Sequence, residues 1–158
     1  MNERKKVANM INPFDLKTAL LAKHAQHVVL IHFPIALFIS AVAFDLTAWW
    51  TKLRGLTDAA YYNLLVAAIS TFPVLATGIV AWQFQLEGQT LNGALLLHLV
   101  LACISSAAIW LVWWLHFRAR RRAEALSVYR LGIEIVGVCI IAFTGYMGGF
   151  LSGVNGPG

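Results

Sequence analysis

Four long apolar stretches dominate this chain. They run from about Val28 to Trp50, Tyr61 to Phe84, Gly93 to Phe117 and Val128 to Leu151. Each is close to the ~20 residues that an α-helix needs to cross the hydrocarbon core of a bilayer. Because the connections are short, neighbouring stretches should run in opposite directions. The pattern predicts an all-α membrane protein, a four-helix transmembrane bundle with up-down-up-down topology.

The composition supports a membrane protein. Hydrophobic residues make up 59% of the 158 residues and charged residues only 12%, and the mean hydropathy is +0.71. That much apolar surface exceeds what the core of one soluble domain can hide. The stretches are also too long for the alternating segments of a β-barrel, which are roughly ten residues each. No Ser-His-Asp pattern, pair of carboxylates at one level or phosphate-binding loop is visible, so a stand-alone soluble enzyme is not expected.

The amino-terminal region should form a separate part. Residues 1–27 are interpreted as a polar tail with a short amphipathic helix, and residues 28–158 as the transmembrane bundle. Between about Pro13 and Gln26, leucines and a phenylalanine alternate with charged side chains, which is typical of an interfacial helix. This helix would lie on the membrane surface or rest against a partner subunit, and the residues do not distinguish the two.

The distribution of positive charge predicts the orientation. The formal net charge is +5, but the basic residues flank the apolar stretches, so lipid headgroups rather than nucleic acid are the expected partner. Lys52 and Arg54 lie in the first link and an arginine cluster in the third, whereas the second link carries only Glu87. The positive-inside rule places the first and third links in the cytoplasm of a bacterial inner membrane and both termini in the periplasm. The basic amino-terminal tail argues against this orientation.

Two histidines provide the main functional clue. His32 and His98 each lie about five residues inside an apolar stretch, the first and the third, which run parallel. Their imidazoles should therefore lie on the same side of the bilayer, at depths that match within one turn. Since no carboxylate or thiolate lies at this depth, a haem b ligated by His32 and His98 through its iron is favoured over a bare metal ion. A structural role is the alternative, because Pro34 leaves the carbonyl of Leu30 without its helical hydrogen bond.

His27 is the next candidate. It lies about 140° around the helix from His32, so both cannot ligate one iron from a straight helix. It is predicted to contact a haem propionate or to exchange a proton with a quinol, and a solvated interfacial histidine is the alternative. Asp45 follows His27 by eighteen residues and shares its helix face. Its predicted role is an ion pair with a nearby basic residue or a place in a proton relay.

The fourth stretch ends in glycines. Gly145 and Gly149 form a small-xxx-small step on the side of the bilayer that holds His32 and His98, so they are predicted to let a porphyrin edge or another helix approach. His116, beside Arg118, is interpreted as an interfacial residue.

Several of these residues also carry a family resemblance. The motif consists of the run from His27 to Leu37, Asp45, the pair Thr77-Gly78, His98, and the run from Thr144 to Gly149. From about residue 24 onward the chain resembles the bacterial four-span membrane family catalogued as domain of unknown function 2231. The resemblance implies the four-span fold and marks His27, His32, Asp45 and His98 as motif positions, but it implies no activity. The sequence departs from the family pattern at Ala81 and at Asn155-Gly156.

These features leave two main hypotheses. In the first, the chain is a haem b subunit that transfers electrons between the quinone pool and a membrane or periplasmic redox partner, and so is an electron-transfer subunit rather than an enzyme by itself. In the second, it is a cofactor-free scaffold or accessory subunit of a membrane complex. A small transporter is less favoured, because the sequence lacks broken helices in paired halves.

Overall fold

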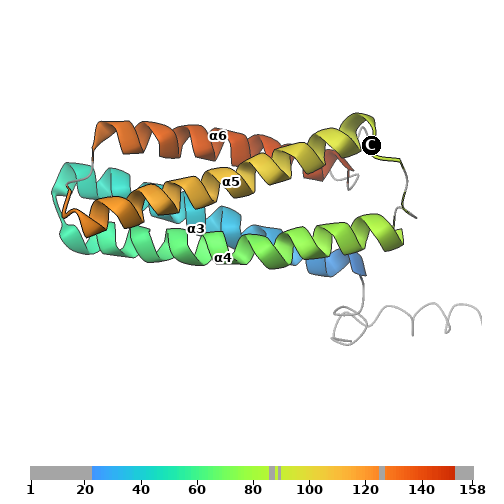
Figure 1. Cartoon of the computed structure of the whole chain (residues 1–158), viewed down its shortest axis with the longest axis horizontal. Coiled ribbons are helices and arrows are strands. Elements are labelled where there is room, and N and C mark those ends of the chain that lie inside the picture. Colours follow the sequence, from blue (N-terminus) through green and yellow to red (C-terminus); the bar gives the residue numbers. More distant parts are fainter. Residues whose placement is uncertain (1–22, 86–87, 89, 125–126, 152–158) are drawn as a thin grey trace, which may run out of the picture.

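The predicted four-helix architecture is confirmed. The computed structural model describes residues 23–85, 88, 90–124 and 127–151. They form the helices α3 (Lys23–Thr51), α4 (Arg54–Gln85), α5 (Gly93–Arg121) and α6 (Val128–Leu151), with successive helices running in opposite directions (Figure 1). The predicted interfacial helix falls mostly outside the described residues, which begin at residue 23 within α3.

Three of the helices extend beyond the apolar stretches that predict them. α3 begins five residues before Val28, α4 begins seven residues before Tyr61, and α5 ends four residues after Phe117. A helix satisfies its own backbone hydrogen bonds, so it does not have to end where the apolar side chains end. At the start of α4, Asp58 forms an ion pair with Arg120 of α5, which ties these extended ends together.

Tight turns join the helices at one end of the bundle. Only residues 52 and 53 separate α3 from α4, and Lys52 adopts a left-handed conformation with φ of 60°. Its backbone N–H donates to the carbonyl of Ala48 at 2.8 Å, which closes the end of α3. After α5, Ala123 is also left-handed, with φ of 51°. Two antiparallel hairpins result, α3 with α4 and α5 with α6.

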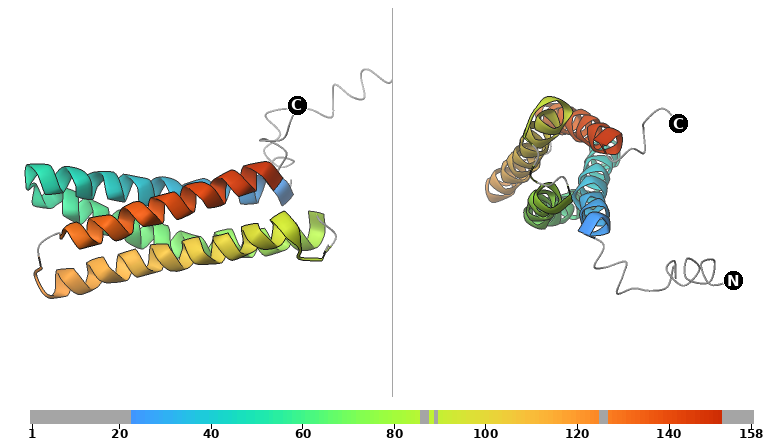
Figure 2. Two further views of the ribbon diagram at one scale, coloured as in Figure 1. Left: turned by 90° about the horizontal axis from the view of Figure 1, so that it is seen from above. Right: turned by 90° about the vertical axis from the view of Figure 1, so that its right-hand side faces the viewer.

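The helices form a ring. α3 packs most extensively on α4, and α5 packs on α6, while α4 also contacts α5 and α3 contacts α6. The end-on view in Figure 2 shows the four helices at the corners of this ring. α3 and α5 are therefore diagonal to one another, a placement that bears on any ligand shared between them.

The hydrophobic core occupies the half of the bundle near the tight turns. At its centre Phe38 is fully buried, and the aromatic ring approaches the backbone of α6 so closely that a Cβ on Gly137 would lie 2.8 Å from Cζ. Alanines let α3 and α4 approach each other. We call this the packed half; its core residues are Phe38, Ala41, Val42, Ala60, Leu64, Ala67, Ala68, Ile109, Val112 and Ile141.

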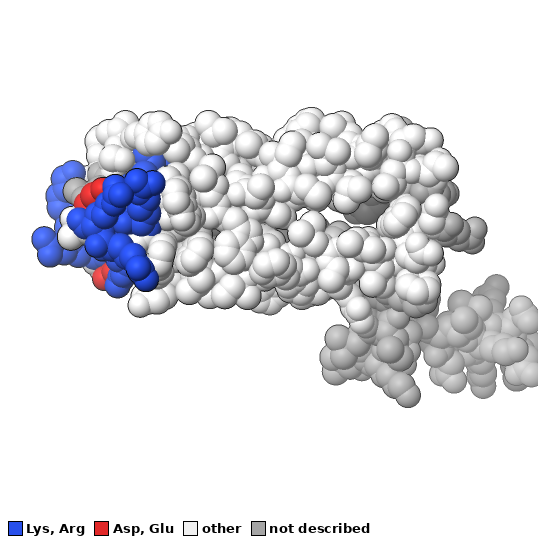
Figure 3. Space-filling view, viewed as in Figure 1, with Lys and Arg blue, Asp and Glu red and all other residues white. Residues whose placement is uncertain are grey.

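The other half of the bundle is not closed. None of the described side chains in residues 26–33, 72–84, 93–104 and 142–151 is buried. Figure 3 shows the surface hollowed between α4 and α5 in this region, which we call the open half. The same view shows lysines and arginines gathered at the opposite end, around the tight turns. The molecule thus has a packed, basic end and an open end.

Candidate functional site

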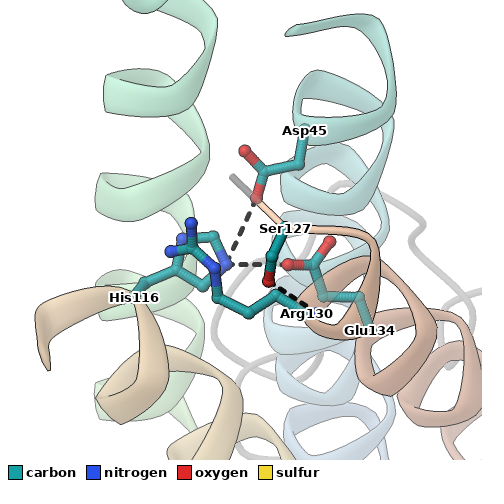
Figure 4. A network of polar contacts seen from close by, with 5 residues as sticks. All are labelled: Asp45, His116, Ser127, Arg130 and Glu134. Atoms are coloured by element: carbon teal, nitrogen blue, oxygen red, sulfur yellow. Dashed lines mark hydrogen bonds and ion pairs between the residues drawn. The ribbon is translucent and has the colours of Figure 1, made fainter. Parts of the chain in front are cut away.

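Three polar side chains meet inside the packed half (Figure 4). Asp45 of α3, His116 of α5 and Glu134 of α6 have exposed fractions of 0%, 4% and 1%. Nε2 of His116 is hydrogen-bonded to Oε1 of Glu134 at 2.7 Å and lies 3.3 Å from Oδ2 of Asp45. We call this group the Asp45–His116–Glu134 cluster; it joins three of the four helices.

The alternation of helix directions brings these residues to one level. Asp45 lies six residues before the end of α3, His116 lies five before the end of α5, and Glu134 lies six after the start of α6. All three helix ends are at the basic end of the bundle. Arg130 precedes Glu134 by one turn on α6, and Figure 4 shows its guanidinium on the side of the cluster where His116 lies.

The cluster leaves buried oxygen atoms without partners. Among the described residues, Oδ1 of Asp45 and Oε2 of Glu134 have no hydrogen-bond partner, and Oδ2 of Asp45 has only its 3.3 Å ion pair with Nε2 of His116. Most buried polar atoms in proteins are hydrogen-bonded, and leaving one unpaired costs about 1–3 kcal/mol. Unpaired carboxylate oxygens are therefore the feature of this cluster that requires an explanation.

Two interpretations from the sequence are wrong here. His116 is not an interfacial residue, because its ring faces the core and its partners are carboxylates on other helices. The expectation that no two carboxylates lie at one level is also wrong, because Asp45 and Glu134 form such a pair. Counting from the ends of the apolar stretches did not reveal the cluster, because His116 is one residue from the end of its stretch, whereas Asp45 and Glu134 are five and six residues inside theirs. The neighbouring Arg118 also suggested an exposed surface.

His27 lies at the open end of α3 and faces α4. Its Nδ1 is 3.1 Å from Oγ1 of Thr77. The hydroxyl of Thr77 already donates to helix carbonyls, at 2.8 Å to that of Pro73, so Nδ1–H of His27 is the donor to Thr77. A Cβ on Gly78 would lie 3.1 Å from Cε1 of His27. The glycine thus lets the half-buried imidazole lie against the α4 backbone.

His98 of α5, the helix diagonal to α3, also lies against a glycine of a neighbouring helix. A Cβ on Gly148 of α6 would lie 3.1 Å from its Cε1, and its Nδ1 is buried without a hydrogen-bond partner among the described residues. Asp45 and His116 lie side by side, and His27 precedes Asp45 by eighteen residues on α3 just as His98 precedes His116 by eighteen residues on α5. The two half-buried imidazoles are therefore at the same depth in the open half.

His32 has a different environment. Its side chain is exposed, and its Nδ1 lies 2.6 Å from the carbonyl of Val28 on the same helix rather than near that of Leu30. Ligation of one iron by His32 and His98 stays a prediction. So does a cofactor contact at Gly145, whose missing Cβ has no atom within 4 Å, and at Gly149, which is half-buried. Gly148, between these two glycines, is the one that lies against His98.

The fold and these sites define a class of protein. Four helices are long and apolar enough to cross a membrane, and their polar residues meet inside the bundle, as in a four-span integral membrane protein. The family model described as "Predicted membrane protein (DUF2231)" matches residues 23–156, so the chain belongs to that family and the resemblance is confirmed. No curated protein and no solved structure matches the chain.

Proposed function

We propose that the protein is a membrane subunit that holds a b-type haem in its open half and transfers electrons between the quinone pool and a redox partner. The observation that supports this proposal is the pair of half-buried imidazoles, His27 and His98, at one depth on diagonal helices. They lie in a part of the bundle where none of the described side chains is buried. Helical bundles build cofactor sites from side chains on facing helices in this way.

The local contacts suit a planar, apolar ligand. Gly78 of α4 and Gly148 of α6 let the two imidazoles lie against the backbones of these helices. Thr77 holds Nδ1 of His27, which makes Nε2 the nitrogen for ligation. Such a hydrogen bond to the second ring nitrogen is the usual way in which a metal-ligating histidine is oriented. Haem iron would be held by the two imidazoles, and the apolar walls would exclude water from it.

This proposal changes one of the two predicted iron ligands. His32 faces the outer surface and its Nδ1 is bound to the backbone of its own helix, so we propose His27 as the second axial ligand beside His98. Ligation by His32 and His98 is the competing assignment. The two assignments differ in which histidine variant loses the haem.

The orientation that we propose places the open half near the periplasm. Lysines and arginines at the opposite end favour the cytoplasmic side of a bacterial inner membrane, with both chain termini in the periplasm (Figure 3). The redox partner would then dock at the periplasmic end of the bundle. A quinone in the bilayer would reach the cofactor through the hollow between α4 and α5.

A visible absorption spectrum of the purified protein tests the proposal. The full chain is purified in detergent from cells supplied with a haem precursor, and its reduced-minus-oxidised spectrum should show sharp α and β bands. The variants H27A and H98A should lose these bands, whereas H32A, a histidine-to-alanine change on the same helix as His27, should keep them.

Two other outcomes are informative. Loss of the bands in H32A but not in H27A would contradict the proposed ligand and support the pair His32 and His98. A folded wild-type protein that is colourless in its native membrane would overturn the haem proposal and leave the cofactor-free scaffold or accessory subunit.

A further inference from the structure

We propose that Asp45, His116 and Glu134 bind one divalent first-row transition-metal ion inside the packed half. This site lies at the opposite end of the bundle from His27 and His98, and it does not depend on the haem proposal. Two carboxylates and one imidazole form a mixed oxygen and nitrogen donor set that suits Zn²⁺, Mn²⁺, Fe²⁺ and Co²⁺. A bare ion of this kind, without an organic cofactor, is the ligand that we infer.

The spacing of the donor atoms is compatible with a common ion. One donor atom from each residue lies within 4.8 Å of the other two. Metal–ligand bonds of about 2.1 Å place neighbouring ligands about 3.0–3.4 Å apart, depending on the coordination geometry. Nε2 of His116 is 2.7 Å from one carboxylate oxygen and 3.3 Å from the other. Small shifts of these side chains would therefore admit an ion.

The unpaired oxygens distinguish this cluster from an ordinary buried ion pair. Asp45 and Glu134 are 0% and 1% exposed, and Asp45 has no hydrogen bond to either carboxylate oxygen among the described residues. Figure 4 shows the carboxyl group of Asp45 directed toward His116 and Glu134. A cation between the three side chains would supply a partner to one oxygen of each carboxylate and to Nε2 of His116 at once. A proton shared between Asp45 and Glu134 is the competing arrangement.

The charges around the cluster also favour a cation. Asp45 and Glu134, when both are ionised, carry two negative charges inside an apolar core, and Arg130 lies on the same side of the cluster as His116. Uncompensated charge in such a core is costly. A divalent ion bound by a neutral imidazole and two ionised carboxylates would balance the two carboxylate charges, and the positive charge of Arg130 would limit the affinity by repulsion.

Metal content of the full chain in detergent tests the proposal. Protein stripped with a chelator is incubated with Zn²⁺, desalted and analysed by mass spectrometry for zinc. The wild-type chain should retain about one zinc ion. The variants D45N and E134Q should lose retention by at least about tenfold. D58N and E124Q are the matched controls, because these carboxylates lie at the same end of the bundle but are 54% and 53% exposed; both should retain zinc like the wild type.

A measurement on the wild-type chain alone covers the case in which the core variants do not fold. With Co²⁺ in place of Zn²⁺, the wild type should show visible d–d bands, and X-ray absorption should show nitrogen and oxygen ligands at about 2.0–2.2 Å. Wild-type protein that retains no more zinc than D45N, or that gives only the spectrum of aqueous Co²⁺, would overturn the proposal. The cluster would then be a hydrogen-bonded network that holds protons alone.

Discussion

At the scale of single residues, α3 carries polar side chains at two levels of its inner face. His27 and Asp45 are eighteen residues apart, about five turns, and both face other helices of the bundle, as that spacing predicts. Their partners differ in kind: His27 meets a hydroxyl and a glycine of α4, and Asp45 meets an imidazole and a carboxylate. One helix face therefore contributes to both candidate sites.

The glycine beside His98 gives a prediction at this scale. In G148A the new Cβ would lie 3.1 Å from Cε1 of His98, closer than nearly all real Cβ contacts, so the imidazole must move by a few tenths of an ångström. We expect this variant to retain less haem, or to bind haem with a shifted α band, in the reduced-minus-oxidised spectrum. G132A, on the same helix but in the packed half, is the control, since its Cβ has no atom within 4 Å. Identical spectra for both variants would contradict the proposed place of His98.

At the scale of helices, the contact between α3 and α6 depends on one glycine. A Cβ on Gly137 would lie 2.8 Å from Cζ of Phe38, whose ring is fully buried and cannot move aside without displacing the core. Overpacking of this kind costs about 1–3 kcal/mol. G137A should therefore lower the free energy of unfolding, measured by titration with sodium dodecyl sulfate in mixed micelles. G132A, whose Cβ has open space, should leave that free energy unchanged or raise it slightly.

The approximate depth of a residue in the membrane could be predicted from the sequence, but the direction of its side chain around the helix could not. Depth along a span can be counted from its ends, and the four spans and their directions follow from such counting. The count matched His98 to the wrong histidine of α3: His27 lies at the level of His98, and His32 lies five residues deeper in the bundle. The direction in which a side chain points around the helix depends on which neighbours pack against it, and the apolar residues are spread around each helix. The exposure of His32 and the burial of His116 therefore could not be predicted in this way.

Helix ends were equally difficult to predict. The residues from Arg54 to Asp58 are polar or small except for Leu56 and were assigned to a link, yet they begin α4. Their helical conformation is supported by contacts that come from another helix, since Arg120 pairs with Asp58 and its guanidinium carbon lies 5.0 Å from the centre of the Tyr61 ring. Hydropathy detects the membrane-spanning part of a helix and not these interfacial extensions.

At the scale of the whole molecule, the basic end predicts the orientation in the membrane. In a background where the exposed Cys103 and Cys139 are replaced by alanine, we expect E124C to react with a membrane-impermeant maleimide only from the cytoplasmic side. T90C, an exposed residue in the link between α4 and α5, should react only from the opposite side. The two cysteine variants are compared by labelling intact cells and inverted membrane vesicles. Labelling of E124C in intact cells and of T90C only in inverted vesicles would contradict the proposed topology.

The division into a packed and an open half has a mechanical consequence. Each hairpin is closed by a short link at the packed end, and the core there holds the two hairpins together. The packed half can therefore act as a hinge between the hairpins. The helix segments of the open half, beyond this hinge, are about 13 residues, or ~20 Å, long. A change of about 10° in the angle between the hairpins would alter the separation at the open end by about 3.5 Å, within the reach of the seven-residue link between α4 and α5. The distance between the two hairpins at the open end is therefore the distance in this fold that a bound ligand can most easily change.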